Sequence, residues 1–173
     1  MTALRRVEPA DVEYLESQHD GPGRAGDESW FGFRDAGSVA KRVAAGETIT
    51  ADRGMLAVVD DQGAVVGELS WIRVFNGPPP GGDCWNMGIW IGPEHRGKGH
   101  GTEAQRLGTE YLFDHTLMER IEAGTESGNV AEQKALEKAG FTREGVLRGA
   151  IFRDGQWHDM VSYSMIRSDL TSG

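Results

Sequence analysis

A glycine-rich stretch at residues 89–104 limits the possible folds of this chain more than any other segment. A short apolar strand ends at Ile91, glycines follow at Gly97, Gly99 and Gly101, and a helix is expected to begin near Gly101. These glycines leave backbone N–H groups unshielded, and the first turn of a helix adds unpaired donors and the positive end of its dipole. The stretch therefore predicts a strand, loop and helix that together bind phosphate.

Two common nucleotide-binding motifs do not match this loop. A P-loop requires G-x-x-x-x-G-K-[ST], whereas Lys98 lies inside the loop and is followed by Gly99. A dinucleotide-binding fingerprint requires G-x-G-x-x-G, and the glycines at 97, 99 and 101 have a different spacing. The loop therefore belongs to another class of phosphate site.

The spacing Arg96-x-x-Gly99-x-Gly101 resembles the [RQ]-x-x-G-x-[GA] pyrophosphate loop of the GNAT superfamily of acyl-CoA N-acyltransferases. Residues 129–145 resemble the later N-x-x-[SA]…E-K-x-G-F…E-G segment of that superfamily. The resemblance is closest to the RimJ/RimL-like (ribosomal-protein-alanine acetyltransferase-like) branch. It implies an α/β fold, the GNAT fold, whose mixed, mostly antiparallel sheet is split beside the acyl-CoA pyrophosphate loop and flanked by helices.

The resemblance also implies which residues contact acetyl-CoA, the expected co-substrate. Backbone near Trp90 and Ile91 lies beside the pantetheine arm, and the side-chain amide of Asn129 fixes that arm near the thioester. The pyrophosphate accepts N–H groups from the loop residues Arg96, Gly97, Lys98, Gly99, His100, Gly101 and Thr102.

The acid and base groups follow less directly, because this chain departs from the superfamily. Leu136 occupies the position of a tyrosine that many relatives use to protonate the leaving thiolate, and the strand ending at Ile91 has no internal glutamate. Glu132 shares a helical face with Asn129, so it either takes part in the reaction or is a first-turn acid favoured by the helix dipole.

Two further carboxylates are candidate catalytic groups. Alternation along residues 64–75 directs Glu68 either into the cleft or toward solvent, and Asp83 begins the next strand. An amine with a pKa of about 10.4 is mostly charged at pH 7. A carboxylate or a water chain that removes its proton therefore favours its attack on the thioester.

Aromatic residues are candidates for substrate binding. Trp30, Phe31 and Trp71 are expected to line the acceptor pocket, and the alternative is that such aromatics pack the domain's edge or core. No metal site is expected, because His95 and His100 have no cysteine or carboxylate at ligand spacing.

Composition narrows the remaining classes. A chain of 173 residues fits one domain, expected to cover 1–173, and the single Cys84 excludes an internal disulfide. A net charge of −9 argues against a nucleic acid partner. The absence of a signal peptide and of an apolar run near 20 residues predicts a cytoplasmic protein without membrane spans. A monomer or a homodimer is expected.

Periodicity and turn residues predict the element order β-α-α-β-β-β-α-β-α-β-β. The expected strands are residues 4–7, 55–60, 64–75, 84–91, 118–123, 141–147 and 157–165, and the expected helices are 11–19, 39–45, 101–115 and 129–139. Residues 20–26 are expected to form a loop, and residues 76–83 a long hairpin loop near the substrate entrance. Ser38 is the expected N-cap of the helix at 39–45. In the helix at 101–115, Ala104, Leu107 and Tyr111 are expected to face the core, with Gln105 elsewhere.

The main functional hypothesis is an acetyl-CoA-dependent N-acetyltransferase. Its acceptor is a primary amine, on a small molecule or a protein N-terminus, which attacks directly in a ternary complex. The alternatives are a catalytically inactive acyl-CoA-binding or regulatory domain, and transfer of another acyl group such as succinyl.

Overall fold

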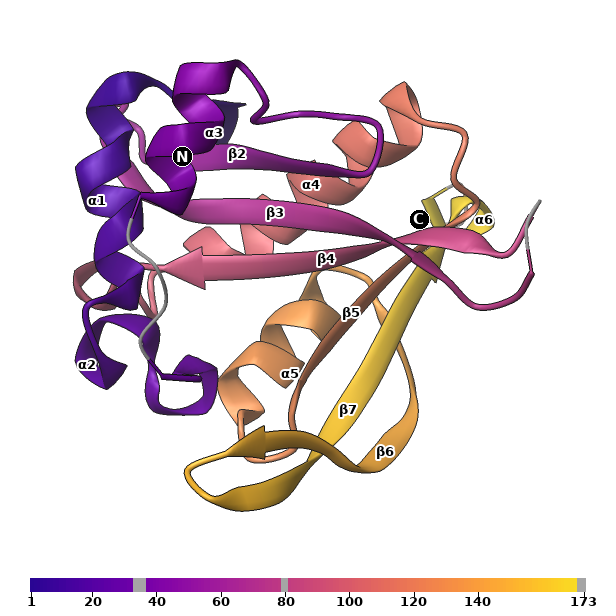
Figure 1. The fold of residues 1–173 in the computed structure, drawn as a ribbon. Coiled ribbons are helices and arrows are strands. Elements are labelled where there is room, and N and C mark those ends of the chain that lie inside the picture. Colours follow the sequence, from indigo (N-terminus) through magenta and orange to yellow (C-terminus); the bar gives the residue numbers. More distant parts are fainter. Residues whose placement is uncertain (33–36, 79–80, 171–173) are drawn as a thin grey trace.

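Seven strands form one sheet in the computed structural model, which describes residues 1–32, 37–78 and 81–170 (Figure 1). Their order across the sheet is β1-β2-β3-β4-β5-β7-β6. The strands are β1 (Ala3–Arg6), β2 (Arg53–Val59), β3 (Val65–Phe75), β4 (Asp83–Ile91), β5 (Arg120–Glu126), β6 (Thr142–Arg153) and β7 (Gln156–Ile166). Only β4 and β5 pair in parallel among these described strands, so the predicted mixed, mostly antiparallel sheet is confirmed.

Helices cover both faces of this sheet. They are α1 (Val12–Glu16), α2 (Pro22–Ala25), α3 (Ser38–Ala45), α4 (His100–His115), α5 (Val130–Lys138) and α6 (Arg167–Leu170). The helix predicted at residues 11–19 is shorter than expected, because 3-10 turns replace its two ends. The predicted loop at 20–26 contains α2, which Pro22 begins at its first position. In the described ranges, no helix is long and apolar enough to cross a membrane.

The α3 helix begins through a contact that its own sequence does not show. Ser38 was the expected N-cap, but the helix starts at Ser38 with Gly37 before it. The Glu16 Oε1 atom of α1 accepts the N–H groups of Val39 and Ala40 at 3.1 and 3.0 Å. A carboxylate from another helix therefore supplies the cap that Ser38 was expected to provide.

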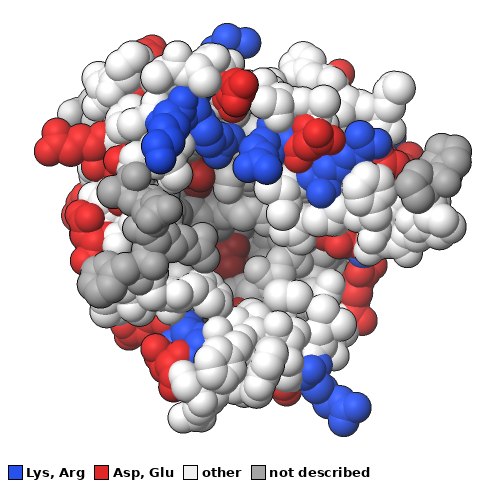
Figure 2. All heavy atoms as spheres, viewed as in Figure 1, with Lys and Arg blue, Asp and Glu red and all other residues white. Residues whose placement is uncertain are grey.

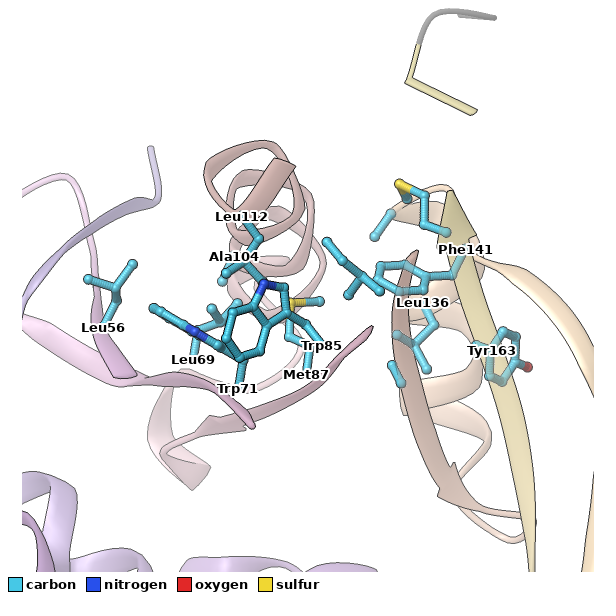
Figure 3. Close-up of a cluster of buried hydrophobic side chains, with 14 of the residues drawn as sticks. Leu56, Leu69, Trp71, Trp85, Met87, Ala104, Leu112, Leu136, Phe141 and Tyr163 are labelled. Atoms are coloured by element: carbon cyan, nitrogen blue, oxygen red, sulfur yellow. The ribbon is translucent and has the colours of Figure 1, made fainter. Parts of the chain in front are cut away.

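Alternation along β3 divides its side chains between two hydrophobic cores. Leu69 and Trp71 enter the larger core, which lies between the sheet and the helices α4 and α5 (Figure 3). Glu68 and Ser70 point to the opposite face of the strand. On that face, Leu15 and Val39 of α1 and α3 pack against β2 and β4 in a smaller core.

The sheet splits where β4 and β5 separate. These two strands pair at three positions, the last joining Met87 to Ala123. Beyond Met87, β4 continues to Ile91 paired with β3, while β5 continues to Glu126 paired with β7. Figure 1 shows the two strands diverging from this point. The register confirms the split that the family resemblance implies.

The C-terminal hairpin is longer than predicted. β6 extends to Arg153 because bulges after Arg143 and Leu147 let the strand resume its pairing with β7. Asp154 and Gly155 have φ values of 50° and 75°, as a two-residue hairpin turn requires. Residues 79–80 of the expected hairpin loop lie outside the described part of the chain, as do residues 33–36.

Candidate active site

A cavity of about 690 Å³ fills the split between β4 and β5. Its walls come from the end of β4, the glycine loop, the end of β5 and the first turns of α5. The lining residues that matter for the chemistry are Trp90, Ile91, Arg96, Gly99, Asn129 and Glu132. Figure 2 shows the molecule hollowed near the centre of this face, with acidic surface inside the hollow and Lys and Arg side chains above it.

The glycine loop supplies a row of backbone donors along one wall. Gly97 and Gly99 have φ values of 74° and 87°, in the left-handed region that favours glycine. Gly99 is the N-cap of α4, which begins at His100, one residue earlier than expected. The first N–H groups of α4 have no intrahelical acceptor, and within the described ranges no hydrogen bond joins the N–H groups of Gly97 and Gly99 to a protein acceptor. The wall therefore suits an anionic group such as a pyrophosphate.

Gly101 differs from the other two loop glycines. Its φ lies outside the left-handed region, and a Cβ added there would lie 3.7 Å from Ile91 Cγ1, an ordinary contact. A Cβ added at Gly97 or Gly99 meets no atom within 4 Å. Backbone conformation therefore requires glycine at 97 and 99 but not at 101.

The cationic side chains of the loop mostly bind other parts of the protein. The Arg96 guanidinium donates to the carbonyl oxygens of Ile91 at 2.9 Å, Arg24 at 2.8 Å and Ala25 at 3.1 Å. The Lys98 Nζ atom donates to Glu94 O at 2.9 Å, and Lys98 does not line the cavity. Arg96 thus ties the end of β4 to α2, and the loop's backbone N–H groups are the donors that remain for a ligand.

The side chain of His100 lines the same cavity. Its Nδ1 atom lies 2.9 Å from Thr2 Oγ1, and burial is the main reason that its pKa is below the usual value. The ring of His95 lies 6.3 Å from that of His100. No group of three His, Cys, Asp or Glu side chains able to hold a metal ion exists among the residues that the structure describes.

Asn129 is placed by the turn that joins β5 to α5. Its backbone N–H donates to Glu126 O at 2.9 Å, and its Oδ1 accepts the backbone N–H of Glu132 at 3.2 Å, which caps the helix. Because the cap uses Oδ1, the Nδ2 amide group is the end of the side chain left to serve a ligand in the cavity. This arrangement is compatible with the predicted contact to pantetheine.

Glu132 lines the cavity beside Asn129. Its Oε1 accepts a hydrogen bond from Gln105 Nε2 of α4. Burial raises the pKa of Glu132 to about 7, although the Gln105 bond acts in the opposite direction. A carboxyl group with this pKa exists in both protonation states near neutral pH.

A second cavity of about 350 Å³ lies on the α1 and α2 side of β3 and β4. It shares Ala25, Ser29, Gly88, Ile89 and Trp90 with the first cavity, so the two adjoin. The residues that line only the second cavity include Gln18, Trp30, Phe31, Glu68 and Ser70.

Glu68 lines this second cavity. Of the two orientations that the sequence allowed, the side chain therefore points into the cleft and not toward solvent. Its Oε2 atom accepts a hydrogen bond from Gln18 Nε2 at 3.3 Å. Burial raises the pKa of Glu68, while Gln18 and the charge of Arg42 act to lower it. The predicted aromatics Trp30 and Phe31 lie in the same lining.

Two predicted site residues lie elsewhere. Trp71 is only 3% exposed in the larger core, with its ring centroid 5.9 Å from that of Tyr111, because alternation directs it to the α4 face. Asp83 binds Arg73, with Oδ2 lying 2.8 Å from Nε and 2.5 Å from Nη2. At about 3.3 Å per residue, Asp83 is on the order of 25 Å along β4 from Ile91. Neither belongs to the two cavities.

Sequence reasoning missed Gln105 and placed it on the exposed side of α4. It predicted an inward stripe of Ala104, Leu107 and Tyr111, whereas Gln105 is 1% exposed. The helix lies so close to β3 at Gly108 that a Cβ there would come 2.6 Å from Leu69 Cδ1. A glycine at a helix–sheet contact carries no hydrophobic signal. The predicted stripe therefore includes Ala104, which is buried in the core, but leaves out the equally buried Gln105. The sequence held one indication of the burial of Gln105. It lies four residues after Gly101, on the same helical face as that loop glycine.

Comparison with known proteins identifies relatives of this chain. The family model described as acetyltransferase (GNAT) domain matches residues 3–142. The probable N-acetyltransferase YjcK of Bacillus subtilis is 32% identical over 116 residues, which are 67% of this chain and 61% of that protein. The ribosomal protein uS5-alanine N-acetyltransferase of Escherichia coli is 28% identical over 113 residues, 65% of this chain and 57% of that protein. The match thus spans less than two thirds of the length of either curated relative.

Solved structures share the whole fold. The crystal structure of spermidine N-acetyltransferase from Vibrio cholerae in complex with CoA and spermine has a TM-score of 0.77 and 19% identity, covering 99% of this chain and 98% of that chain. At that identity, the likeness shows the fold alone.

Proposed function

Because the chain belongs to the GNAT acetyltransferase family, we propose that it transfers an acetyl group from acetyl-CoA to a primary amine. The observation that carries the proposal is the pair of adjoining cavities with a shared wall at Gly88, Ile89 and Trp90. One cavity offers backbone donors to an anion, and the other offers a buried carboxyl group. Two substrates entering from opposite faces of the sheet would meet at this wall.

The first cavity is the proposed site for acetyl-CoA. Its pyrophosphate accepts N–H groups from the glycine loop, and its pantetheine arm lies along the edge of β4 that β5 leaves unpaired beyond Met87. The Nδ2 group of Asn129 holds the arm from the opposite wall. These residues position the thioester, which supplies the acetyl group.

The second cavity is the proposed site for the acceptor amine. Glu68 accepts a proton from the incoming ammonium group, so that the neutral nitrogen attacks the thioester carbonyl carbon. Trp30 and Phe31 flank the bound acceptor. At 350 Å³ the cavity suits a small molecule or the first residues of a protein N-terminus.

Bond formation and bond cleavage balance within this pair of cavities. The carbon–nitrogen bond forms and the carbon–sulfur bond breaks, so the sulfur leaves with the electron pair. Glu132 gives its proton to that thiolate. The nitrogen, which gave its first proton to Glu68, loses its second proton as the amide forms. Exchange with solvent then removes the proton from Glu68 and restores the one on Glu132, so one proton is released in each turnover. A group with a pKa of about 7 is matched to this task at neutral pH.

Thiol release from acetyl-CoA across an amine panel tests the proposal. The panel holds a peptide beginning with alanine, spermidine and a set of amino acids, because the relatives act on a ribosomal protein and on a polyamine. We expect acceptor-dependent thiol release with at least one of them. Calorimetry with acetyl-CoA is run in parallel, and succinyl-CoA replaces acetyl-CoA in a second series.

A binding or regulatory domain is the competing function. Leu136 in place of a tyrosine and the absence of a carboxylate within β4 beyond Asp83 favour it. Tight acetyl-CoA binding without thiol release on any amine would support this alternative. Faster thiol release from succinyl-CoA than from acetyl-CoA would instead show that succinyl is the acyl group transferred.

A further inference from the structure

Gln105 makes an unusual contact for a buried polar residue. It is 1% exposed on α4, among core residues such as Ala104 and Leu112. Its Nε2 atom donates to Glu132 Oε1 on α5, which lines the larger cavity. Its amide group therefore reaches from the core to the wall of the proposed site.

The other end of the same amide has no partner. Within the described residues, Gln105 Oε1 is buried and accepts no hydrogen bond. A buried polar atom without a partner destabilises the folded protein, and an apolar side chain of similar length would avoid that cost. The packing of α4 therefore gives no reason for glutamine at this position.

A glutamine can serve both protonation states of a neighbouring carboxyl group. The ionised form accepts from the amide Nε2, which is the contact that the structure contains, and the protonated form can donate to Oε1 after the amide turns by half a rotation. The two amide ends have nearly the same shape, so the turn needs no repacking. Methionine fills a similar space but makes neither hydrogen bond.

No ion pair competes with Gln105 for this carboxyl group in the described part of the chain. The other titratable side chains that line the cavity are His95, Arg96, His100, Lys134 and Lys138. None of them bonds the Glu132 carboxyl group, whose one side-chain partner among the described residues is Gln105 from α4.

We propose that Gln105 is a positioning residue that fixes Glu132 at the cavity wall and sets the proton affinity of its carboxyl group. The inference rests on the proposed function in one respect, which is that the Glu132 proton goes to the leaving thiolate. The contact between the two side chains stands without it. Gln105 keeps the carboxyl group able to give up and regain a proton near neutral pH.

Carbon-13 NMR of the glutamate carboxyl groups tests this inference without reference to turnover. The protein is labelled at the glutamate δ-carbon, and the Glu132 signal is assigned by its loss in Glu132→Gln. We expect the titration midpoint of Glu132 in Gln105→Met to rise by about one pH unit, a tenfold change in proton affinity, because a donor to the ionised form is lost.

Thr109→Val is the matched control for the packing of α4. Thr109 is equally buried and its Oγ1 bonds Gln105 O at 2.9 Å, so valine changes the helix without touching the Glu132 contact. Its Glu132 midpoint should equal that of the unmodified protein. An unchanged midpoint in Gln105→Met overturns the inference, as does an equal shift in both variants.

The pH profile of kcat separates this inference from the proposed function. If Glu132 protonates the thiolate, the high-pH limb of the profile shifts to higher pH in Gln105→Met, by the same amount as the NMR midpoint. A shifted NMR midpoint with an unmoved limb supports the Gln105 inference and removes Glu132 from the reaction. Activity loss without any change of midpoint overturns the inference, because it shows a merely structural role.

Discussion

Glu68 and Trp90 are cross-strand partners in the register of β3 and β4. Both line the smaller cavity, and Trp90 also lines the larger one. The Trp90 Nε1 atom donates to Arg24 O at 3.0 Å, which fixes the ring against α2. The carboxyl group of Glu68 is thereby held beside the wall that the two cavities share.

Glu68→Gln should lower kcat by about a hundredfold, as expected for loss of a general base. Acetyl-CoA affinity should stay the same, because Glu68 does not line the larger cavity. Since burial raises the pKa of Glu68, and a base must be ionised, the rate of the unmodified enzyme should fall as pH falls through that raised pKa. Asp83→Asn is the control, and loss of activity in it alone would move the base to β4.

Glu132→Gln should stabilise the protein at alkaline pH. The folded-state pKa of about 7 lies above the ordinary glutamate value of 4.5, so folding opposes ionisation of Glu132. The resulting penalty is absent below pH 4.5, grows up to about pH 7 and is complete above it, on the order of 1–3 kcal/mol. Urea unfolding at pH 5 and pH 8 should show a gain that is larger at pH 8. The exposed Glu13→Gln variant should show no such pH dependence.

Gly99→Ala should weaken acetyl-CoA binding by at least tenfold in calorimetry. The substitution strains a residue with φ of 87°, and the backbone shift that relieves this strain moves the N–H groups of the loop. Gly63→Ala is the control for strain, because its φ is 82° and it lies in the β2–β3 turn. Both variants should lose about 1 kcal/mol of stability. Equal acetyl-CoA affinity in the two would contradict a phosphate-binding loop.

Two variants of Asn129 test the roles of its amide oxygen and its amide nitrogen separately. Asn129→Ala removes both and should destabilise α5 by about 1 kcal/mol through loss of the cap. Asn129→Asp keeps the acceptor for the Glu132 N–H but has no amide donor, so stability should be retained. Both variants should lose turnover by more than they lose acetyl-CoA affinity, as expected when a reacting group is misplaced. Normal turnover in Asn129→Asp would show that capping is the whole role of Asn129.

The parts of the site predicted best from sequence were those built from backbone. The loop between Arg96 and Thr102 and the turn at Asn129 carry glycine and capping signals that act over a few residues. Side-chain roles were harder to predict, because they depend on strand register and helix placement. Glu68 and Trp71 lie three residues apart on one strand and therefore face opposite sides of the sheet.

The errors have the same origin in tertiary contacts. Asp83 was a candidate because it is close in sequence to the site, yet it lies at the far end of an extended strand. Gln105 was placed outward because Gly108, which brings α4 onto the sheet, has no side chain to mark the contact. The Glu16 cap of α3 comes from a separate helix, and no local pattern could show it.

The short pairing of β4 with β5 has a consequence for how such an enzyme can diverge. Because three residue pairs join the two strands, the width of the gap beyond them is not set by a backbone ladder. It depends instead on side chains that meet across α4 and α5, such as Gln105 and Glu132. Substitutions at those helix positions can widen or narrow the gap while every strand keeps its register. Changes in two helices can therefore alter the size of the acyl group that fits the gap, with the sheet inherited intact.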